Sequence, residues 1–473
     1  MRWRELTRPL RMERVAVVAP AGRLRSVLLA VADAGVVELE VLSDARPGPA
    51  TEALQRARQA GADASRAAPR LAVEPREAEA YVADARIDLL AGEAELERIA
   101  SSAVRDDRVA ALAGWCPAQS ANSLAARLEP LGGALVPLPG PPGTSPPTLL
   151  APPTAAAAFQ PLVDTYATVP YADLDPALFA GVVYVAMFGM MFGDVGHGAL
   201  LFAGGIALRY GSWKRLAPLR WAAPFLLGGG LASVLFGLLY GEAFGPTHLV
   251  PVLWLAPLDH PTTLLAVAVA IGSVLLTVAY ALGTVNRWRE GGFGRALVAI
   301  TGIAGSGVYL GLALVVAGWH WHVVAVGLLG GVIAAAALGL GFVGLLSSAG
   351  GGASGAIQAS VELFDSVLRL GVNTISFARL AAFGLTHAAL ESIVWRGTSL
   401  LWEKGPAWWP VAVVVFAVGN ALAFALEALV AGVQALRLDY YELFSRIFVD
   451  EGRPFRPWRI PTLCAKEATC SSG

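Results

Sequence analysis

The chain has 473 residues, 56% of them hydrophobic and only 15% charged, and its mean hydropathy is +0.58. A soluble globular protein of this length needs far more polar surface. The composition therefore excludes a soluble globular protein and indicates a membrane protein. The formal net charge of -1, without a stripe of basic residues, excludes nucleic acid as a partner.

Charge is unevenly distributed along the chain. Arg, Glu and Asp are frequent over roughly the first 120 residues and sparse in the rest. We therefore predict a cytoplasmic domain over residues 1–166 and a transmembrane domain with a cytoplasmic C-terminal tail over residues 167–473. The opening MRWRELTRPLRMERVAV carries charges throughout and lacks the apolar core of a signal peptide, which predicts a cytoplasmic N-terminus.

The predicted cytoplasmic domain begins with a strand, a helix and a second strand. Val15–Val18 is a β-prone run, Leu24–Ala34 has helical periodicity, and strand chemistry returns after Gly35. Residues 51–107 then turn helical and charged, which predicts a helical hairpin inserted into a small α/β domain. The Pro-rich segment Leu138–Pro153 predicts a linker, because proline supports neither a helix interior nor a central strand.

Eight apolar runs in the second domain approach the roughly 20 residues that a membrane crossing requires. The first two are short and joined by a glycine-broken turn, whereas the last two are long enough to require a strong tilt. The chain is thus predicted to be mainly α, with about eight transmembrane helices, two of them long and tilted. The runs are Ala177–Phe192, Gly196–Leu208, Ala222–Ala243, Thr262–Gly283, Leu297–Ala317, His322–Leu346, Gly355–Val394 and Trp408–Phe444.

Positive charges set the predicted orientation. Lys and Arg cluster after the second, fourth and eighth runs, whereas the segments FGPTHLVPVLWLAPLDH and GWHW carry none. Because cytoplasmic loops carry the excess of Lys and Arg, both termini are predicted to face the cytoplasm. The sequence shows no sorting signal, so we expect a multi-pass protein of a prokaryotic plasma membrane.

Two arginines lie deep inside the last two runs, Arg379 in NTISFARLAAFGLTHAAL and Arg437 in LEALVAGVQALRLDYYELF. A guanidinium stays protonated in proteins, so placing one within a bilayer costs free energy unless a carboxylate or a water-filled cavity meets it. These two arginines therefore predict an ion pathway.

Four sequence blocks carry a family resemblance. In this order, they are DPALFAGVVYVAMFGMMFGDVGHGALL (Asp175–Leu201), SVLFGLLYGEAFG (Ser233–Gly245), NTISFARLAAFGLTHAAL (Asn373–Leu390) and EALVAGVQALRLDYYELFSRIFVDEGRPFRPW (Glu427–Trp458). They resemble the membrane stator subunit of V-type and archaeal-type rotary ATPases, called subunit a or subunit I. LAGWCPA (Leu112–Ala118) and the opening strand resemble the cytoplasmic domain of the same family, so the resemblance covers nearly the whole chain.

The resemblance implies a noncatalytic stator that forms two ion half-channels against a rotating ring. Each ring subunit bears one carboxylate, and Arg379 and Arg437 would face it and favour release of its ion. Proton or sodium flow would thereby be coupled to ATP hydrolysis or synthesis. The implied partners are the c-ring proteolipid subunits, the peripheral stalk subunits of E/G type, the membrane subunit of d/C type linked to the central stalk, the soluble catalytic ATPase subunits and the lipid bilayer.

Helix geometry places three further residues relative to the arginines. At 1.5 Å per residue, His387 lies about 12 Å from Arg379, and Glu427 lies about 15 Å from Arg437, toward the external side of both antiparallel helices. Both are predicted to line an external half-channel. Asp365 lies about 21 Å to the other side of Arg379 on nearly the same helix face, which predicts a role in the cytoplasmic half-channel; the resemblance places it at a position that is usually glutamate in the family.

Each of these residues has a structural alternative. Arg379 could pair with Asp365, and Arg437 with Glu427, as ion pairs that only hold the helices together. A histidine such as His387 on a helix face is often a hydrogen-bonded packing residue. The residues alone leave these alternatives open.

Three other polar residues are interpreted as structural. Asp194 and His197 in FGDVGHG suggest a metal site, but two ligands are too few, and a tight helix break capped by Asp194 is preferred. Glu242 is either part of a channel wall or a hydrogen-bonded polar group, and the structural role is favoured.

The sequence contains no GxxxxGK[ST] loop and therefore predicts no nucleotide site in this chain. No cofactor and no metal are predicted either.

Two other functions are considered. An autonomous secondary cation transporter would usually show inverted repeats with broken helices in both halves, whereas the charges here concentrate in the last two runs. A membrane scaffold could retain the fold without conduction, but the presence of both arginines, Glu427 and His387 counts against it.

Overall fold

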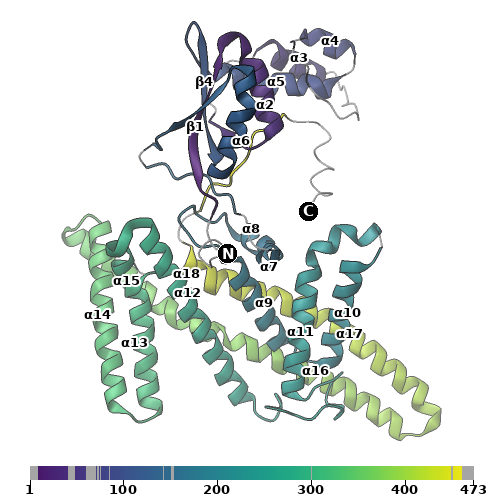
Figure 1. Ribbon diagram of the computed structural model, residues 1–473. Helices are drawn as coiled ribbons and strands as arrows, with labels where there is room; N and C mark the ends of the chain where they lie inside the picture. The colour runs from purple at the N-terminus through teal and green to yellow at the C-terminus, as the bar shows by residue number, and fades with distance from the viewer. Residues whose placement is uncertain are drawn as a thin grey trace. The chain divides into compact units, whose positions relative to one another are not determined.

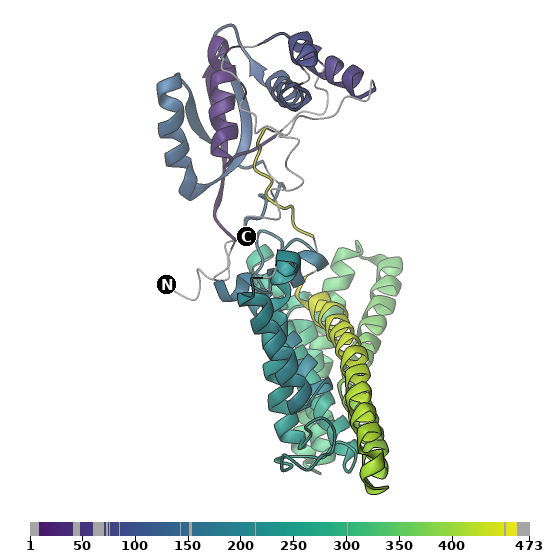
Figure 2. The same ribbon diagram turned by 90° about the vertical axis from the view of Figure 1, so that its right-hand side faces the viewer.

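Helices predominate in the computed structural model (Figures 1 and 2). It describes residues 9–40, 48–59, 71, 74, 76–84, 86–141, 143–150, 154–212, 214–299, 301–448 and 451–460. The chain divides into two compact units, one formed by Pro9–Ala151 with the segment that starts at Gly452, the other by Pro152–Glu451. All the described strands lie in the first unit, so the mainly α prediction with a small α/β part is confirmed.

The first unit is built on an antiparallel sheet. β1 (Met12–Pro20) lies between β4 (Val109–Pro117) and β5 (Ala134–Leu138), while β2 (Glu38–Leu39) and β3 (Val104–Arg105) both pair with β4. Alternate residues of β1 are buried, as expected for a strand with one face against the core. The sheet is therefore the platform on which the helices of this unit pack.

The predicted strand, helix and strand are confirmed. After β1 the chain forms α2 (Leu24–Ala34), which ends where Gly35 adopts a left-handed conformation with φ of +58° and donates to the carbonyl of Val31. Glycine suits this position because it has no Cβ to clash there. The buried face of α2 packs with side chains of β1, β4 and α6 (Ala118–Leu128) in one core.

The predicted insertion is helical in its described residues, but it contains three helices rather than the pair of a hairpin, and it carries its own small core. It contains α3 (Pro49–Gln59), α4 (Ala78–Ala83) and α5 (Ile87–Ser101), whose apolar side chains pack together. An ion pair joins the insertion to α2, because Arg25 lies 2.6 Å from Glu93. The insertion is thus packed on the α/β part by both apolar and charged contacts.

The segment after Gly452 is part of the first unit. Trp458 donates its backbone N–H to the carbonyl of Val37 at 2.7 Å, and its ring lies in the main core. Arg453 pairs with Glu38 at 3.1 Å, and its carbonyl accepts from Thr148 in the Pro-rich segment. The described part of that segment beyond Leu138 forms no helix, in agreement with the linker prediction.

The second unit is all helical in its described residues. Two helices of 15 and 16 residues, α9 (Ala177–Met191) and α10 (Val195–Tyr210), follow the short helices α7 (Thr154–Ala157) and α8 (Gln160–Tyr166). The longer helices, with the two short elements that end the unit, are α11 (Ala223–Tyr240), α12 (Pro261–Val298), α13 (Ile303–His320), α14 (Val324–Ser348), α15 (Gly352–Ser376), α16 (Ala378–Glu403), α17 (Trp409–Leu438), a π-helix (Asp439–Phe444) and α18 (Ser445–Ile447).

Among the described residues, six helical stretches rather than eight are long and apolar enough to cross a membrane, which makes this a multi-pass membrane protein. The first two predicted crossings, α9 and α10, are each shorter than the roughly 30 Å hydrocarbon core, because Asp194 starts a new helix between them. The six stretches are Lys214–Tyr240, Pro261–Val298, Ile303–His320, Val324–Ser348, Gly352–Glu403 and Pro406–Ile447.

Two helix boundaries differ from the prediction. The seventh run forms two helices, α15 and α16, separated at Phe377, whose side chain is fully buried. Helical geometry in α12 continues past Gly283 and is interrupted only at Gly291 and Gly292, where Gly292 has a φ of +75°. Glycine is required there because other residues rarely adopt that conformation.

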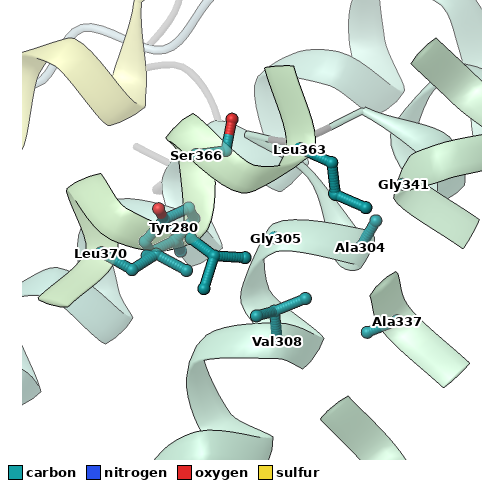
Figure 3. Close-up of a pocket in the computed structure, with 10 residues that line it drawn as sticks. Tyr280, Ala304, Gly305, Val308, Ala337, Gly341, Leu363, Ser366 and Leu370 are labelled. Atoms are coloured by element: carbon teal, nitrogen blue, oxygen red, sulfur yellow. The ribbon is translucent and has the colours of Figure 1, made fainter. Parts of the chain in front are cut away.

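The helices of the second unit pack as a bundle with one oblique pair. In Figure 1, α13 and α14 run nearly parallel to each other, while α16 and α17 lie side by side and cross the view obliquely. Mostly apolar residues of α12, α13, α14 and α15 meet around a small cavity beside Tyr280, and several of them are small, including Ala304, Gly305 and Ala337 (Figure 3). This contact holds α15 against the bundle.

Candidate functional site

The oblique pair α16 and α17 carries most of the predicted site residues. The helices are antiparallel and joined by a turn at which Trp402 and Trp409 stack with ring centroids 4.9 Å apart. His387 of α16 and Glu427 of α17 form a hydrogen bond midway along the pair. This register brings Arg379 and Arg437 near each other at the opposite end of the pair from the turn.

Arg379 is the second residue of α16, directly after the break at Phe377. Its side chain is half-buried, and its Nη1 atom is buried without a hydrogen-bond partner among the described residues. Glu442 is the carboxylate close enough to interact with it electrostatically, and Arg437 is the neighbouring cation. Two arginines beside one carboxylate leave local positive charge that an external anion would offset.

Arg437 is exposed on the outer face of α17. It continues a stripe of exposed apolar side chains that recur with helical spacing along that face. The stripe consists of Leu422, Leu426, Leu429 and Val433. A charged residue at the end of such a stripe is costly against lipid, so the position favours a polar partner on this face.

Asn373, Glu442 and Arg446 form a polar network next to the two arginines. With its amide nitrogen facing Glu442, Asn373 donates to Glu442 Oε2 at 2.9 Å and accepts from Arg446 Nη2 at 2.7 Å. Glu442 lies in the π-helix that follows α17, a local widening often found at functional sites. Asn373 thus joins α15 to the end of α17.

Asp365 lies away from the arginines. It is exposed on α15 and pairs with Arg369 at 2.7 Å, one turn along the same helix. In the part of the chain that the structure describes, neither Arg379 nor Arg437 forms an ion pair. The alternative pairs Arg379–Asp365 and Arg437–Glu427 are therefore absent from these residues: Asp365 pairs with Arg369, and Glu427 with His387.

Arg287, unlike Arg379 and Arg437, is fully buried and shows what a structural ion pair looks like in this protein. It is 2% exposed and lies between Glu290 and Asp173, with 3.9 Å to the Asp173 carboxylate. Burial raises the pKa of Asp173, which lies in the loop before α9, and the neighbouring Glu290 raises it further. Arg379 has no comparable pair of carboxylates among the described residues.

His387 is part of a buried histidine–carboxylate cluster to which α10 and its N-cap, the loop after α11, and α17 also contribute. We define the cluster as Asp194, His197, Glu242, His387, Glu391 and Glu427. Except for Glu427, whose side chain is 12% exposed, all its members are at most 6% exposed. Four carboxylates in so small a buried space must share protons or bind a cation, because uncompensated buried charge is costly.

Asp194 has the capping role that the sequence predicts. Its Oδ1 accepts from the backbone N–H of His197 at 2.8 Å, and its Oδ2 accepts from the N–H of Gly245 at 3.1 Å. The first bond begins α10, and the second fastens the loop after α11. The same cap turns the His197 ring into the cluster.

Glu242, interpreted from sequence as structural, lies within electrostatic range of His387 and Glu427. His197 Nδ1 lies 3.6 Å from Glu391 Oε1, too far for a hydrogen bond. Aromatic rings enclose His197, with centroids 5.4 to 5.7 Å from its own, and they are Phe192, Phe244 and Phe424. The cluster is thus a polar centre with an apolar wall.

Sequence reasoning missed Glu391, Glu442 and Asn373. Glu391 follows His387 by four residues, so helical spacing could have placed both on one face. Glu442 lies five residues after Arg437, and Asn373 six residues before Arg379, so the polar network depends on the helix break and the π-helix. The cluster also shows that polar residues are not confined to the last two predicted runs, which weakens that argument against a transporter.

Comparison with known proteins relates part of this chain to a family. The sequence profile of the V-type ATPase 116 kDa subunit family matches residues 101–259. A-type ATP synthase subunit I of Halobacterium salinarum is 29% identical over 384 residues, covering 66% of this chain and 51% of that protein. Over residues 101–259 the chain is similar to the V-type ATPase 116 kDa subunit family.

Other archaeal members of the family are similar to the same degree. Subunit I of Archaeoglobus fulgidus is 28% identical over 412 residues, covering 73% of this chain and 58% of the relative. Subunit I of Pyrococcus horikoshii is 26% identical over 311 residues, covering 63% of this chain and 45% of the relative. The chain thus spans about half the length of the curated family members it matches.

Proposed function

We propose that this chain is the ion-translocating stator subunit in the membrane sector of a V/A-type rotary ATPase. It would couple proton or sodium flow to ATP hydrolysis or synthesis without acting on ATP itself. The relatives named A-type ATP synthase subunit I support this role.

The observation that carries the proposal is the exposed Arg437 at the end of an apolar stripe, beside the half-buried Arg379. An outward-facing guanidinium in a membrane helix needs an anionic partner, and the apolar stripe needs an apolar surface to cover it. A ring of lipophilic subunits, each with one carboxylate, meets both requirements. The arginines would stabilise the ionised carboxylate and so favour release of its ion.

The two half-channels are assigned to opposite sides of the arginine pair. The histidine–carboxylate cluster, eight residues along α16 from Arg379, would form the external half-channel, because its groups can pass protons between closely spaced oxygens and nitrogens. Asp365 would serve the cytoplasmic half-channel as an exposed carboxylate on α15. Arg379 would keep the two half-channels from joining.

The setting follows from the same proposal. The chain would lie in a prokaryotic plasma membrane with both termini in the cytoplasm. Its partners would be the c-ring, peripheral stalk subunits of E/G type, a central-stalk membrane subunit of d/C type and the catalytic ATPase subunits.

ATP-driven ion uptake tests the proposal. Vesicles carrying the purified complex would be compared for the native chain, Arg379→Ala and Arg379→Lys, at equal assembly and equal ATPase content. Arg396→Ala is the matched control, because Arg396 is an exposed arginine on the same helix, away from the pair. We expect Arg379→Ala to abolish uptake while Arg396→Ala retains it.

Two results would contradict the proposal. Unchanged uptake by Arg379→Ala, with the complex intact, would make that arginine structural. Cation exchange by the chain reconstituted without ring or ATPase subunits would favour the secondary transporter instead.

A further inference from the structure

The histidine–carboxylate cluster contains buried polar atoms whose bonding capacity is unused. Both carboxylate oxygens of Glu391 and both ring nitrogens of His197 are buried without a hydrogen bond of good geometry among the described residues, although the Asn420 side chain lies close to His197. His197 and Glu391 are 1% and 0% exposed. Such groups are expensive to bury unless something binds them.

The geometry of the cluster suits one ion. The ligand atoms of Asp194, His197 and His387 lie within 4.8 Å of one another, and so do those of His387, Glu391 and Glu427. Ligands of one tetrahedral ion, with bonds of about 2.0–2.1 Å, lie about 3.3 Å apart, so small side-chain rotations close the site. His387 belongs to both groups and is the centre of the site.

Glu427 orients the central histidine. Its hydrogen bond to His387 Nδ1 leaves His387 Nε2 buried and without a partner among the described residues. A carboxylate that holds one imidazole nitrogen while the other binds a metal is a common arrangement in metal sites. The pair therefore presents a preoriented nitrogen ligand to the centre of the cluster.

We propose that the cluster binds one divalent metal ion of the zinc type through His197, His387, Asp194 and Glu391, with Glu427 positioning His387. Two imidazole nitrogens favour Zn²⁺ over Mg²⁺ or Ca²⁺, which take oxygen ligands. The phenylalanine wall around His197 limits solvent access and strengthens the bonds to the ion. The sequence alone suggested only Asp194 and His197 as metal ligands, and two ligands are too few to define a metal site.

Metal binding to the purified full chain in detergent tests this proposal without ring or ATPase subunits. After chelation, the chain would be titrated with Zn²⁺ by calorimetry, and the bound ion examined by X-ray absorption. We expect one Zn²⁺ per chain with two imidazole ligands in the first shell. His197→Ala and Glu391→Gln should each weaken Zn²⁺ binding at least tenfold, while His260→Ala, at the exposed N-cap of α12, should not change it.

The thermal transition of each variant is measured, so that lost Zn²⁺ binding is not confused with lost folding. If His197→Ala does not fold, the proposal is tested by Glu391→Gln and by the number of imidazole ligands that X-ray absorption finds in the native chain. Zinc bound without imidazole, or binding that the cluster variants leave unchanged, would mean adventitious surface sites and would overturn the proposal.

Inhibition of ATP-driven uptake by Zn²⁺ is a second test. Unlike the binding measurements, it rests on the proposed function. An ion in the cluster would occupy the external half-channel, so Zn²⁺ should inhibit ATP-driven uptake at the concentrations that fill the site. Stoichiometric binding without inhibition would confirm the metal site and contradict the half-channel assignment, so the two failures are distinguishable.

Discussion

His387 on α16 and Glu427 on α17 are joined by a hydrogen bond across the antiparallel pair, eight residues from Arg379 and ten from Arg437. The bond fixes the register of the two helices, because a slip by one residue would separate the two side chains. The same register brings the arginines together at the end of the pair. The position of the His387–Glu427 pair therefore sets the position of Arg379 relative to Arg437.

The first prediction concerns this hydrogen bond. A double-mutant cycle with His387→Leu and Glu427→Leu should give a coupling energy of about 1–3 kcal/mol, because each single change leaves a buried polar group unpaired. The measurement is thermal unfolding of the detergent-solubilised chain. Combining either change with Gln358→Leu, an exposed position on α15, should be additive within about 0.5 kcal/mol. Additivity within the His387–Glu427 cycle would disprove the coupling.

The second prediction concerns the helix break before Arg379. A Cβ on Gly272 would lie 2.1 Å from Cγ of Phe377, the buried side chain that separates α15 from α16. Gly272→Ala should destabilise the chain by about 1–3 kcal/mol and reduce ATP-driven uptake, because displacing Phe377 also moves Arg379.

Gly294 provides the matched control for that change. It lies on the same helix, and a Cβ there would meet nothing within 4 Å. Gly294→Ala should leave uptake unchanged. Equal loss of uptake in both variants would show that the effect does not pass through Phe377.

The third prediction concerns the network behind the arginines. Asn373→Leu removes the partner of both Glu442 and Arg446, and should lower the free energy of unfolding by about 1–3 kcal/mol. Gln358→Leu makes the same kind of change on the exposed face of α15 and should have little effect on unfolding. Unfolding of the two variants at the same temperature would mean that Asn373 contributes no buried hydrogen bonds.

The fourth prediction concerns pH in the first unit. Hydrogen bonds from Arg14 lower the pKa of the Glu40 carboxyl. Because the folded pKa lies below the unfolded value of about 4.3, the pair stabilises the fold above that pH, and the contribution disappears as pH falls through the folded pKa. Its size should be about 1 kcal/mol or less, as for other partly exposed pairs.

Calorimetric unfolding of the native chain and Glu40→Gln between pH 7 and pH 3 checks the sign. The native chain should unfold at the higher temperature at neutral pH, and the difference should close at acid pH. Asp107→Asn, at an exposed position of the same unit, serves as the control. A difference that grows toward acid pH would contradict the argument.

Sequence alone determined the character of this protein. The apolar runs, the Gly35 helix end, the Asp194 cap and the intramembrane arginines all follow from local chemistry, because helix periodicity, caps and permanent charges act over a few residues. The family resemblance follows from motif order. These features predicted a membrane protein similar to the family that the comparisons found.

Only the tertiary structure decided which polar residues meet. Asp194 and His197 are about 190 residues before His387 and Glu391 in the chain, and no periodicity links such distant positions. Asp365, which shares a helix face with Arg379 in an ideal helix, forms its ion pair with Arg369 instead. Helix pitch is a local property, whereas the crossing and register of helices depend on side-chain packing between segments far apart in sequence.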